Sequence, residues 1–209
     1  MIERIASKQN MSKPDVTSAG LASPVSDAQQ IFRGVLTALS EPGRVLRLPG
    51  LPESGLPLNP ASLGVLLTLA DGDTPVWLDD RATAAASYLR FHTGAPVVED
   101  KSAARFALIA DAQRCPALDD FAAGSEDYPD RSATLILEVA RLMEAGPITL
   151  RGPGIPDRRN LTIEGLPAGF LAAWSANRAL FPRGVDVILT CGAEIVGLPR
   201  RVMLEGPCM

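Results

Sequence analysis

The stretch FPRGVDVILTCGAEIVGLPR, residues 181–200, limits the fold more than any other part of the chain. Residues 185–189 form a short apolar run rich in β-branched side chains, Cys191-Gly192 can make a turn, and residues 195–198 resume the apolar pattern. This succession predicts a strand, a tight turn and a second strand. The first run shows no period-two alternation, so we expect both of its faces to be covered, as in the interior of a sheet with helices packed on it.

Asp186 places a carboxylate inside this apolar run. An unpaired charge in a strand carries a large desolvation cost, so Asp186 needs a partner or a position at a surface edge. The nearby Arg183 and the backbone N–H groups of a neighbouring loop are the candidates, and such a contact would tie the start of the strand to the preceding helix. Pro182 and Pro199 lie where a missing N–H does least harm, which fixes both ends of the unit.

The other apolar runs predict helices and strands in alternation. The first helix is expected to start at Ser26, which forms a capping-box pattern with Gln29, and to end at Glu41-Pro42-Gly43. The second is expected to start at the Asn59 cap and Pro60 and to end at Asp71-Gly72. Two more helices are expected over 82–91 and from Pro167 through Trp174. Strands are expected over 44–48, 74–78 and 148–150, with further apolar runs over 106–110 and 133–142. This order predicts the α/β class, with a mixed sheet, helices on its faces and hairpins toward the C-terminus.

The length of 209 residues and the hydrophobic share of 46% suit one core and are short for two. Residues 1–23 are polar and without a sustained period, so we expect a flexible N-terminal tail there. Residues 24–209 are expected to form a single α/β domain. Met1 and Met11 are both candidate starts of the chain.

Charge and hydropathy exclude several classes of partner. The formal charge of -4, from 20 basic and 24 acidic residues, gives no basis for binding nucleic acid or an anionic membrane surface. No uninterrupted apolar run reaches the length of a membrane span and no secretory leader is visible, so we expect a cytoplasmic protein. The mean hydropathy of +0.13 is high for such a chain and predicts a homodimer that buries surplus apolar surface.

Residue types that carry chemistry are scarce. His92 is the only histidine and follows Arg90 at a predicted helix end, where a histidine is more often a cap or a packed side chain than a catalyst. A multi-histidine metal site is impossible, and three widely spaced cysteines do not suit an iron–sulfur cluster. We therefore expect no metal and no catalytic residue that sequence alone can name.

Lysine is also rare, with Lys8 and Lys13 in the predicted tail and Lys101 in a polar run. A lysine that forms a Schiff base must be held and partly desolvated in a pocket, and none of these contexts predicts one. Pyridoxal phosphate chemistry is therefore disfavoured. We expect no bound cofactor.

The segment RGPGIPDRR, residues 151–159, combines flexible glycines with three arginines. Such a loop can hold a phosphate or phosphonate through backbone N–H groups and guanidinium forks. It matches neither the P-loop nor GxGxxG, and the pattern is more typical of a turn with solvated arginines. The candidate ligand-binding residues are Arg90, His92, Arg151, Arg158 and Arg159.

Four acidic residues surround Trp77, namely Asp71, Asp73, Asp79 and Asp80. They can suggest a divalent metal site. The sequence DGDTP is more typical of a helix stop followed by a turn, and we favour that interpretation.

Several of these segments together resemble one family. The segments are DAQQIFRGVLTALSEPG (27–43), LLTLADGDTPVWL (66–78), LRFHTGAPVV (89–98), ATLILEVARL (133–142) and FPRGVDVILTCGAEIVGLPR (181–200). They are similar to the H subunit of the bacterial carbon–phosphorus lyase core complex, the PhnH family. The resemblance extends in order over about residues 24–202.

The resemblance implies a role in cytoplasmic machinery that draws phosphorus from alkylphosphonates. In that pathway the core complex couples a phosphonate to the ribose carbon of ATP with release of adenine, and a separate radical subunit later cleaves the carbon–phosphorus bond. Family members resemble the large domain of pyridoxal phosphate (PLP) transferases but lack the cofactor lysine. The family implies homodimers and assembly with subunits G, I and J, and it supplies no catalytic residue for transfer to this chain.

Two alternatives to a non-autonomous subunit stay open. The first is a stand-alone enzyme that uses His92 with Asp71 or Asp73 as an acid–base pair. The second is a small-molecule binding protein whose 151–159 loop holds a nucleotide or phosphonate. Turnover by the isolated protein would favour the first, and binding of ATP or methylphosphonate without turnover would favour the second.

Overall fold

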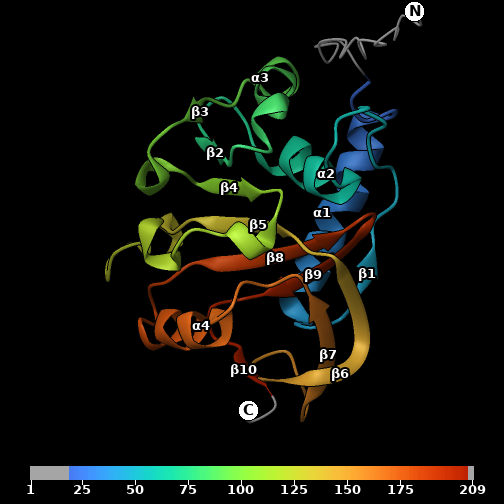
Figure 1. The fold of residues 1–209 in the computed structure, drawn as a ribbon. Helices are drawn as coiled ribbons and strands as arrows, with labels where there is room; N and C mark the ends of the chain where they lie inside the picture. Colours follow the sequence, from blue (N-terminus) through green and yellow to red (C-terminus); the bar gives the residue numbers. More distant parts are fainter. Residues whose placement is uncertain (1–18, 207–209) are drawn as a thin grey trace, which may run out of the picture.

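The predicted hairpin lies in the middle of a mixed sheet in a computed structural model that describes residues 19–206 (Figure 1). β8 (Asp186–Cys191) and β9 (Glu194–Leu198) run antiparallel around a loop of Gly192 and Ala193. Gly192 has a φ of 58°, a left-handed conformation that glycine adopts without a Cβ clash. The prediction of a strand, a tight turn and a second strand is confirmed.

The main sheet has seven strands in the order β1-β9-β8-β5-β4-β2-β3. The strands from β8 to β3 are parallel to their neighbours, whereas β9 and β1 are antiparallel additions at one side. The predicted α/β class with a mixed sheet is thus confirmed. The remaining strands of this sheet are β1 (Leu46–Arg47), β2 (Val76–Leu78), β3 (Val97–Val98), β4 (Phe106–Ile109) and β5 (Thr134–Glu138).

Helices cover one face of the main sheet (Figure 1). Leu108, Ile136 and Ile188 come from three neighbouring parallel strands and are buried in the same core as the helices. An apolar stripe along the first of these helices supplies the opposing surface. The helices are α1 (Pro24–Ser40), α2 (Pro60–Leu69) and α3 (Ala86–Thr93).

The opposite face of the main sheet carries α4 (Phe170–Ala179) and a small second sheet. Leu135 and Leu189 point to this side and share a core with Trp174, which is fully buried. The indole N–H of Trp174 donates to the carbonyl of Val202 at 2.7 Å, so burial leaves its polar atom paired. Both faces of β8 are therefore covered, as its lack of alternation predicted.

The second sheet is antiparallel and has the order β10-β6-β7. The strand predicted over 148–150 is only the end of a much longer strand, because a bulge between Glu144 and Ile148 interrupts its pattern. β7 was not predicted at all, since the arginine-rich segment before it indicated a loop. The strands are β6 (Arg141–Arg151), β7 (Arg159–Glu164) and β10 (Met203–Glu205).

The start of α1 differs from the prediction. The helix begins at Pro24, and the carboxylate of Asp27 accepts the backbone N–H of Ser23 at 2.7 Å. The predicted capping box of Ser26 with Gln29 is therefore wrong. The physical reason is that Pro24 is already suited to the first helical position, so the helix starts earlier than the box would place it.

Short 3-10 helices connect the strands. The predicted helix over 82–91 is divided between one of them and α3, and the acidic stretch through 119–130 is largely a loop that contains two more. Their bounds are Thr83–Ala85, Lys101–Ala103, Ala112–Arg114, Leu118–Asp120 and Pro129–Arg131. Within residues 19–206 no helix combines the length and the hydropathy that crossing a bilayer requires. Most of the predicted tail lies outside the described residues, as do Lys8, Lys13 and Cys208.

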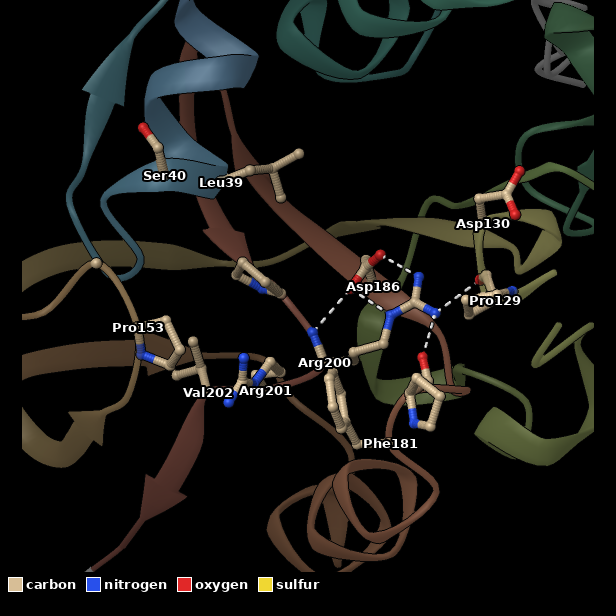
Figure 2. Close-up of a pocket in the computed structure, with 13 residues that line it drawn as sticks. Leu39, Ser40, Pro129, Asp130, Pro153, Phe181, Asp186, Arg200, Arg201 and Val202 are labelled. Carbon is tan, nitrogen blue, oxygen red and sulfur yellow. Dashed lines mark hydrogen bonds and ion pairs between the residues drawn. The ribbon is translucent and has the colours of Figure 1, made fainter. Parts of the chain in front are cut away.

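Asp186 has a partner, and of the two predicted candidates the backbone N–H of a neighbouring loop is confirmed whereas Arg183 is not. Its carboxylate accepts from the backbone N–H of Arg200 at 2.7 Å and from the guanidinium of the same residue (Figure 2). The guanidinium also donates to the carbonyls of Pro129 and Pro182 and to the hydroxyl of Ser132. These contacts join the end of β9 to the segments that precede β5 and β8.

The predicted partner, Arg183, pairs instead with Glu126 at 2.9 Å. Both side chains of that pair are well exposed, at 38% and 71%. Those of Arg200 and Asp186 are only 13% and 23% exposed. The more buried carboxylate is held by the arginine that can also satisfy nearby carbonyls, because partly buried charges need every hydrogen bond available.

We expect Asp186→Asn to destabilise the protein, because the Arg200 guanidinium would keep its partly buried position without a counter-charge. The expected loss is about 1–3 kcal/mol, below that of a fully buried pair since water reaches both side chains. Urea denaturation of the isolated protein measures it. Glu126→Gln, which breaks the exposed pair, is the control and should change stability by less than about 1 kcal/mol. Equal stability of Asp186→Asn and the parent protein would contradict this structural role.

Candidate functional site

A polar pocket of about 340 Å³ lies where the parallel strands β4 and β5 end. Neighbouring parallel strands present their carboxyl ends at one edge of the sheet, and α/β proteins bind ligands outside that edge. We call it the carboxyl-edge pocket. Charged and amide side chains line it, namely Asn59, Arg81, Asp111, Gln113 and Glu138. It is the candidate small-molecule site of the protein.

Regular elements position these side chains. Glu138 is the last residue of β5, and Asp111 and Arg81 follow the ends of β4 and β2. Asn59 directly precedes α2. Side chains at the ends of packed strands and helices are held more rigidly than side chains on long loops, so the pocket has a defined shape.

Glu138 is the most constrained of the lining residues. Its Oε1 accepts the backbone N–H of Asn59 at 2.8 Å, and the hydroxyl of Ser62 also hydrogen-bonds to the carboxyl. Burial raises the pKa of Glu138, and these hydrogen bonds only partly oppose the shift. The carboxyl can therefore hold or release a proton closer to neutral pH than an exposed glutamate.

The predicted side-chain cap of α2 is wrong, although the helix boundary is right. The side chain of Asn59 makes no cap hydrogen bond. Its Nδ2 instead donates to the carbonyl of Thr190 on β8 at 3.3 Å. The side chain that the sequence assigned to a local helix end thus joins α2 to the main sheet.

Arg81 and Asp111 form an ion pair in the pocket, with 3.0 Å between Nη1 and Oδ2. The Asp111 side chain is 23% exposed and that of Arg81 is 58% exposed. Asp79 lies near this pair, and its carboxylate accepts the backbone N–H of Ala110. Burial raises the pKa of Asp79. The pocket therefore contains more acidic than basic groups.

The structure places the predicted residues Arg90 and His92 in the last turn of α3. The imidazole ring of His92 packs against the rings of Tyr88 and Phe91, with centroid distances of 4.5 and 5.0 Å. Neither Arg90 nor His92 lines the carboxyl-edge pocket. A histidine in such contacts fits a packing role.

The three predicted arginines of the 151–159 segment lie on the second sheet or directly beside it. Arg151 ends β6 and Arg158 precedes β7, both exposed, whereas the guanidinium of Arg159 donates to the carbonyls of Glu41 and Pro42 at 2.9 and 3.1 Å. Arg159 therefore satisfies backbone carbonyls just after the end of α1. Figure 1 shows α3 and the second sheet at opposite ends of the molecule, so the structure does not bring the predicted residues into one site. Anion binding by either group stays a prediction.

The acidic residues around Trp77 do not gather around one point. Asp71 accepts from the backbone N–H of Asp73 and from the hydroxyl of Thr74, at 3.0 and 2.5 Å, which confirms the preferred interpretation as a turn. The side chain of Asp79 instead accepts the backbone N–H groups of Ala82 and Ala110. Among residues 19–206 no three histidine, cysteine, aspartate or glutamate side chains are placed to share a metal ion.

Sequence reasoning missed the lining residues of the carboxyl-edge pocket. A usable signal existed, because Glu138, Asp111 and Asp79 are each the polar residue at or after the end of an apolar run. Parallel strands place such residues together at one edge. The signal required the prediction that β2, β4 and β5 are parallel neighbours, and the sequence alone does not specify their pairing.

A larger pocket of about 530 Å³ lies at the opposite end of the parallel strands, beside Arg200 (Figure 2). Its lining is mostly apolar and includes Leu39, Phe181 and Val202. The guanidinium of Arg201 lies 4.6 Å from the ring centroid of Phe181. The guanidinium of Arg200 is already bonded to protein groups, and most of the lining is apolar. This pocket is therefore suited to contact with apolar groups of a ligand or partner.

The fold and the two pockets define an α/β protein with a small polar pocket at the carboxyl edge of a mixed sheet and an apolar pocket at the other edge. Comparison with protein families gives a match over residues 19–205 to the family described as bacterial phosphonate metabolism protein (PhnH). The chain belongs to this family, which confirms the resemblance inferred from its sequence segments.

Two curated relatives match most of the chain. The "Alpha-D-ribose 1-methylphosphonate 5-triphosphate synthase subunit PhnH" of Rhizobium meliloti (strain 1021) is 42% identical over 192 residues, covering 91% of this chain and 96% of the relative. The "Putative C-P lyase subunit protein HtxG" of Stutzerimonas stutzeri is 36% identical over 176 residues, covering 82% and 83%. Both relatives are named as subunits.

We expect Glu138→Gln to stabilise the protein at pH 8. The raised pKa means that the folded state binds the Glu138 proton more tightly than the unfolded state, so the free energy of unfolding falls as pH rises between the unfolded and folded pKa values. Glutamine keeps an acceptor for the Asn59 N–H and carries no charge. The expected gain in Tm is about 2–4 °C for each kcal/mol of desolvation removed, and it should shrink as pH is lowered.

Thermal denaturation of the parent protein and the variant between pH 5 and 8 measures this effect. Asp71→Asn is the control of opposite sign, because hydrogen bonds from Thr74 and the Asp73 N–H lower the pKa of Asp71. Its ionised form stabilises the fold and is fully populated throughout this range, so the variant should be less stable than the parent by an amount that does not change between pH 5 and 8. A Glu138→Gln variant less stable than the parent at pH 8 would contradict the assignment.

Proposed function

We propose that the protein is a non-autonomous subunit of the carbon–phosphorus lyase core complex in alkylphosphonate catabolism. In this role it supports formation of ribose 1-alkylphosphonate 5-triphosphate from ATP and a phosphonate, with release of adenine. The observation that carries the proposal is the family match over residues 19–205, together with two relatives that are both named as subunits. The site of action is the cytoplasm, where ATP is available.

The local structure supports a subunit over an acid–base enzyme that uses His92. The exposed ring of His92 makes edge contacts with two aromatic rings, and the Asp71 carboxylate is engaged in its own turn. A general base needs a reachable proton and a defined site around it. The carboxyl-edge pocket provides such a defined site, but neither His92 nor Asp71 lines it.

The seven-stranded mixed sheet also supports a likeness to the large domain of PLP transferases. Lys101 precedes β4, at the opposite end of that strand from the carboxyl-edge pocket, and its Nζ pairs with Asp120 at 2.8 Å. An ammonium in that pair is not positioned to form a Schiff base in the pocket. The proposal is therefore a PLP-transferase-like domain that works without pyridoxal phosphate.

We predict that this chain co-purifies with the other core subunits, of the G, I and J types, when all are expressed together. The isolated chain should form no nucleoside phosphonate from ATP and methylphosphonate, whereas the complete complex should. Affinity purification through a tag on another subunit, followed by mass spectrometry, measures the association. Recovery of the other subunits as an assembly that excludes this chain would contradict the proposal.

The homodimer in isolation is the second part of the proposal, and a stripe on α1 supports it. Val25, Phe32 and Leu36 are 77%, 44% and 51% exposed. Their spacing places them on one side of the helix, away from its buried face. The stripe continues toward Leu39, which lines the apolar pocket with the half-exposed Phe181. Aligned apolar side chains of this kind are typical of an interface.

We expect the isolated protein to have twice the chain mass of 22.1 kDa by light scattering. Leu36→Glu should shift it toward the monomer, because an interface buries a new charge only at high cost. Gln30→Glu adds the same charge at an exposed position of α1 about 120° around the helix, and should leave the dimer unchanged. A monomeric parent protein would contradict the homodimer.

A further inference from the structure

Three of the backbone N–H groups that line the carboxyl-edge pocket, and a nitrogen of its one guanidinium, are already bonded to protein groups. Anion sites use backbone N–H groups that point at the ligand, often with an unpaired guanidinium. Here the lining N–H groups of Ala110, Val139 and Ala140 donate to Asp79, Thr190 and Glu164, at 3.0, 2.9 and 2.8 Å. The Arg81 guanidinium is paired with a carboxylate of the same pocket.

The pocket instead presents hydrogen-bond acceptors. Glu138 and Asp111 contribute carboxylates, and only the single charge of Arg81 opposes them. The amide nitrogen of Asn59 donates to the protein, to the carbonyl of Thr190. The local excess of negative charge attracts cations and N–H or O–H donors and repels phosphates.

The shape of the pocket depends on a close approach of two segments. Gly165, directly after β7, has a φ of 100°, and a Cβ added there would lie 2.9 Å from the backbone nitrogen of Ala140. Only glycine allows the chain after β7 to close this side of the pocket. The volume of about 340 Å³ suits a small molecule.

We infer that the carboxyl-edge pocket binds a neutral or cationic small molecule with two or more N–H or O–H donors, the chemistry shared by amines, nucleobases and sugars, and that it excludes phosphates and phosphonates. Glu138 and Asp111 already accept from Asn59 and Arg81, but a carboxylate can accept several hydrogen bonds, so both can also accept from the ligand. Arg81 limits the negative charge that the ligand meets. This inference concerns the isolated chain and does not depend on its assembly into a complex.

The test is calorimetry and NMR titration of the isolated full-length protein with five probes. Adenine, ribose and ethanolamine represent the three kinds of donor, and ATP and methylphosphonate represent the anions. We expect at least one donor probe to bind with a Kd of about 1 mM or tighter, and the anions to bind at least about tenfold more weakly. Chemical-shift changes should centre on residues 110–113 and 138–140.

Three variants connect binding to the named groups. Glu138→Gln should weaken the donor probe about tenfold, because a charged acceptor becomes a neutral amide. Arg81→Gln frees Asp111 and should strengthen a cationic probe, whereas in an anion site the same change would weaken ATP. Glu205→Gln is the control, since it makes the same chemical change on the exposed end of β10 and should have no effect.

Three outcomes would overturn the inference. The first is no binding of any donor probe at about 10 mM. The second is binding of ATP or methylphosphonate that shifts the pocket residues and is lost in Arg81→Gln. The third is donor binding that Glu138→Gln leaves unchanged. If Glu138→Gln does not fold, Arg81→Gln still decides the question. It should strengthen binding of a cationic probe if the pocket binds donors, and weaken binding of ATP if the pocket binds anions.

Discussion

The rest of the structure depends on β8, a strand paired on both sides and buried on both faces. It is parallel to β5 and antiparallel to β9, and its apolar side chains divide between two cores. Its first residue, Asp186, carries the charge that such a strand can least accommodate without a partner. Arg200 resolves this by pairing with Asp186 and also donating to two carbonyls and a hydroxyl from the segments before β5 and β8. One guanidinium thus fixes the amino ends of two central strands.

The two ends of the parallel strands have different physical roles. At the amino ends Arg200 and Asp186 are paired with each other, and the pocket beside them is mostly apolar. At the carboxyl ends polar side chains line an open pocket, and burial raises the pKa values of Glu138 and Asp79. A buried carboxyl whose ionised form is penalised reduces stability, and proteins tolerate that cost mainly at sites that bind or react. The contrast makes the carboxyl edge the better candidate for ligand chemistry.

Membership of the PhnH family agrees with how the surface of this chain is built. The helices bury one apolar side against the main sheet, yet α1 keeps Phe32 and Leu36 exposed on another side. The helix therefore has a second apolar side that faces solvent. Exposed apolar surface of this kind is unfavourable for a protein that works alone. A partner that covers the stripe would recover this area as binding energy. The scarcity of histidine and lysine fits a subunit without catalytic residues of its own. The exposed apolar side chains fit a subunit that contacts a partner.

The sequence by itself determined the β8–β9 hairpin, the α2 boundary at Pro60, the mixed α/β class and the family, because each is encoded in short-range patterns or in segments that keep their order. Only the tertiary structure decided which groups meet. Arg200 rather than Arg183 pairs with Asp186, the strand β7 is stabilised by its pairing with β6, and Asn59 meets Glu138 across 79 positions of the chain. These contacts follow from strand register and from competition for hydrogen bonds in partly buried surroundings, and neither is a local property of the sequence.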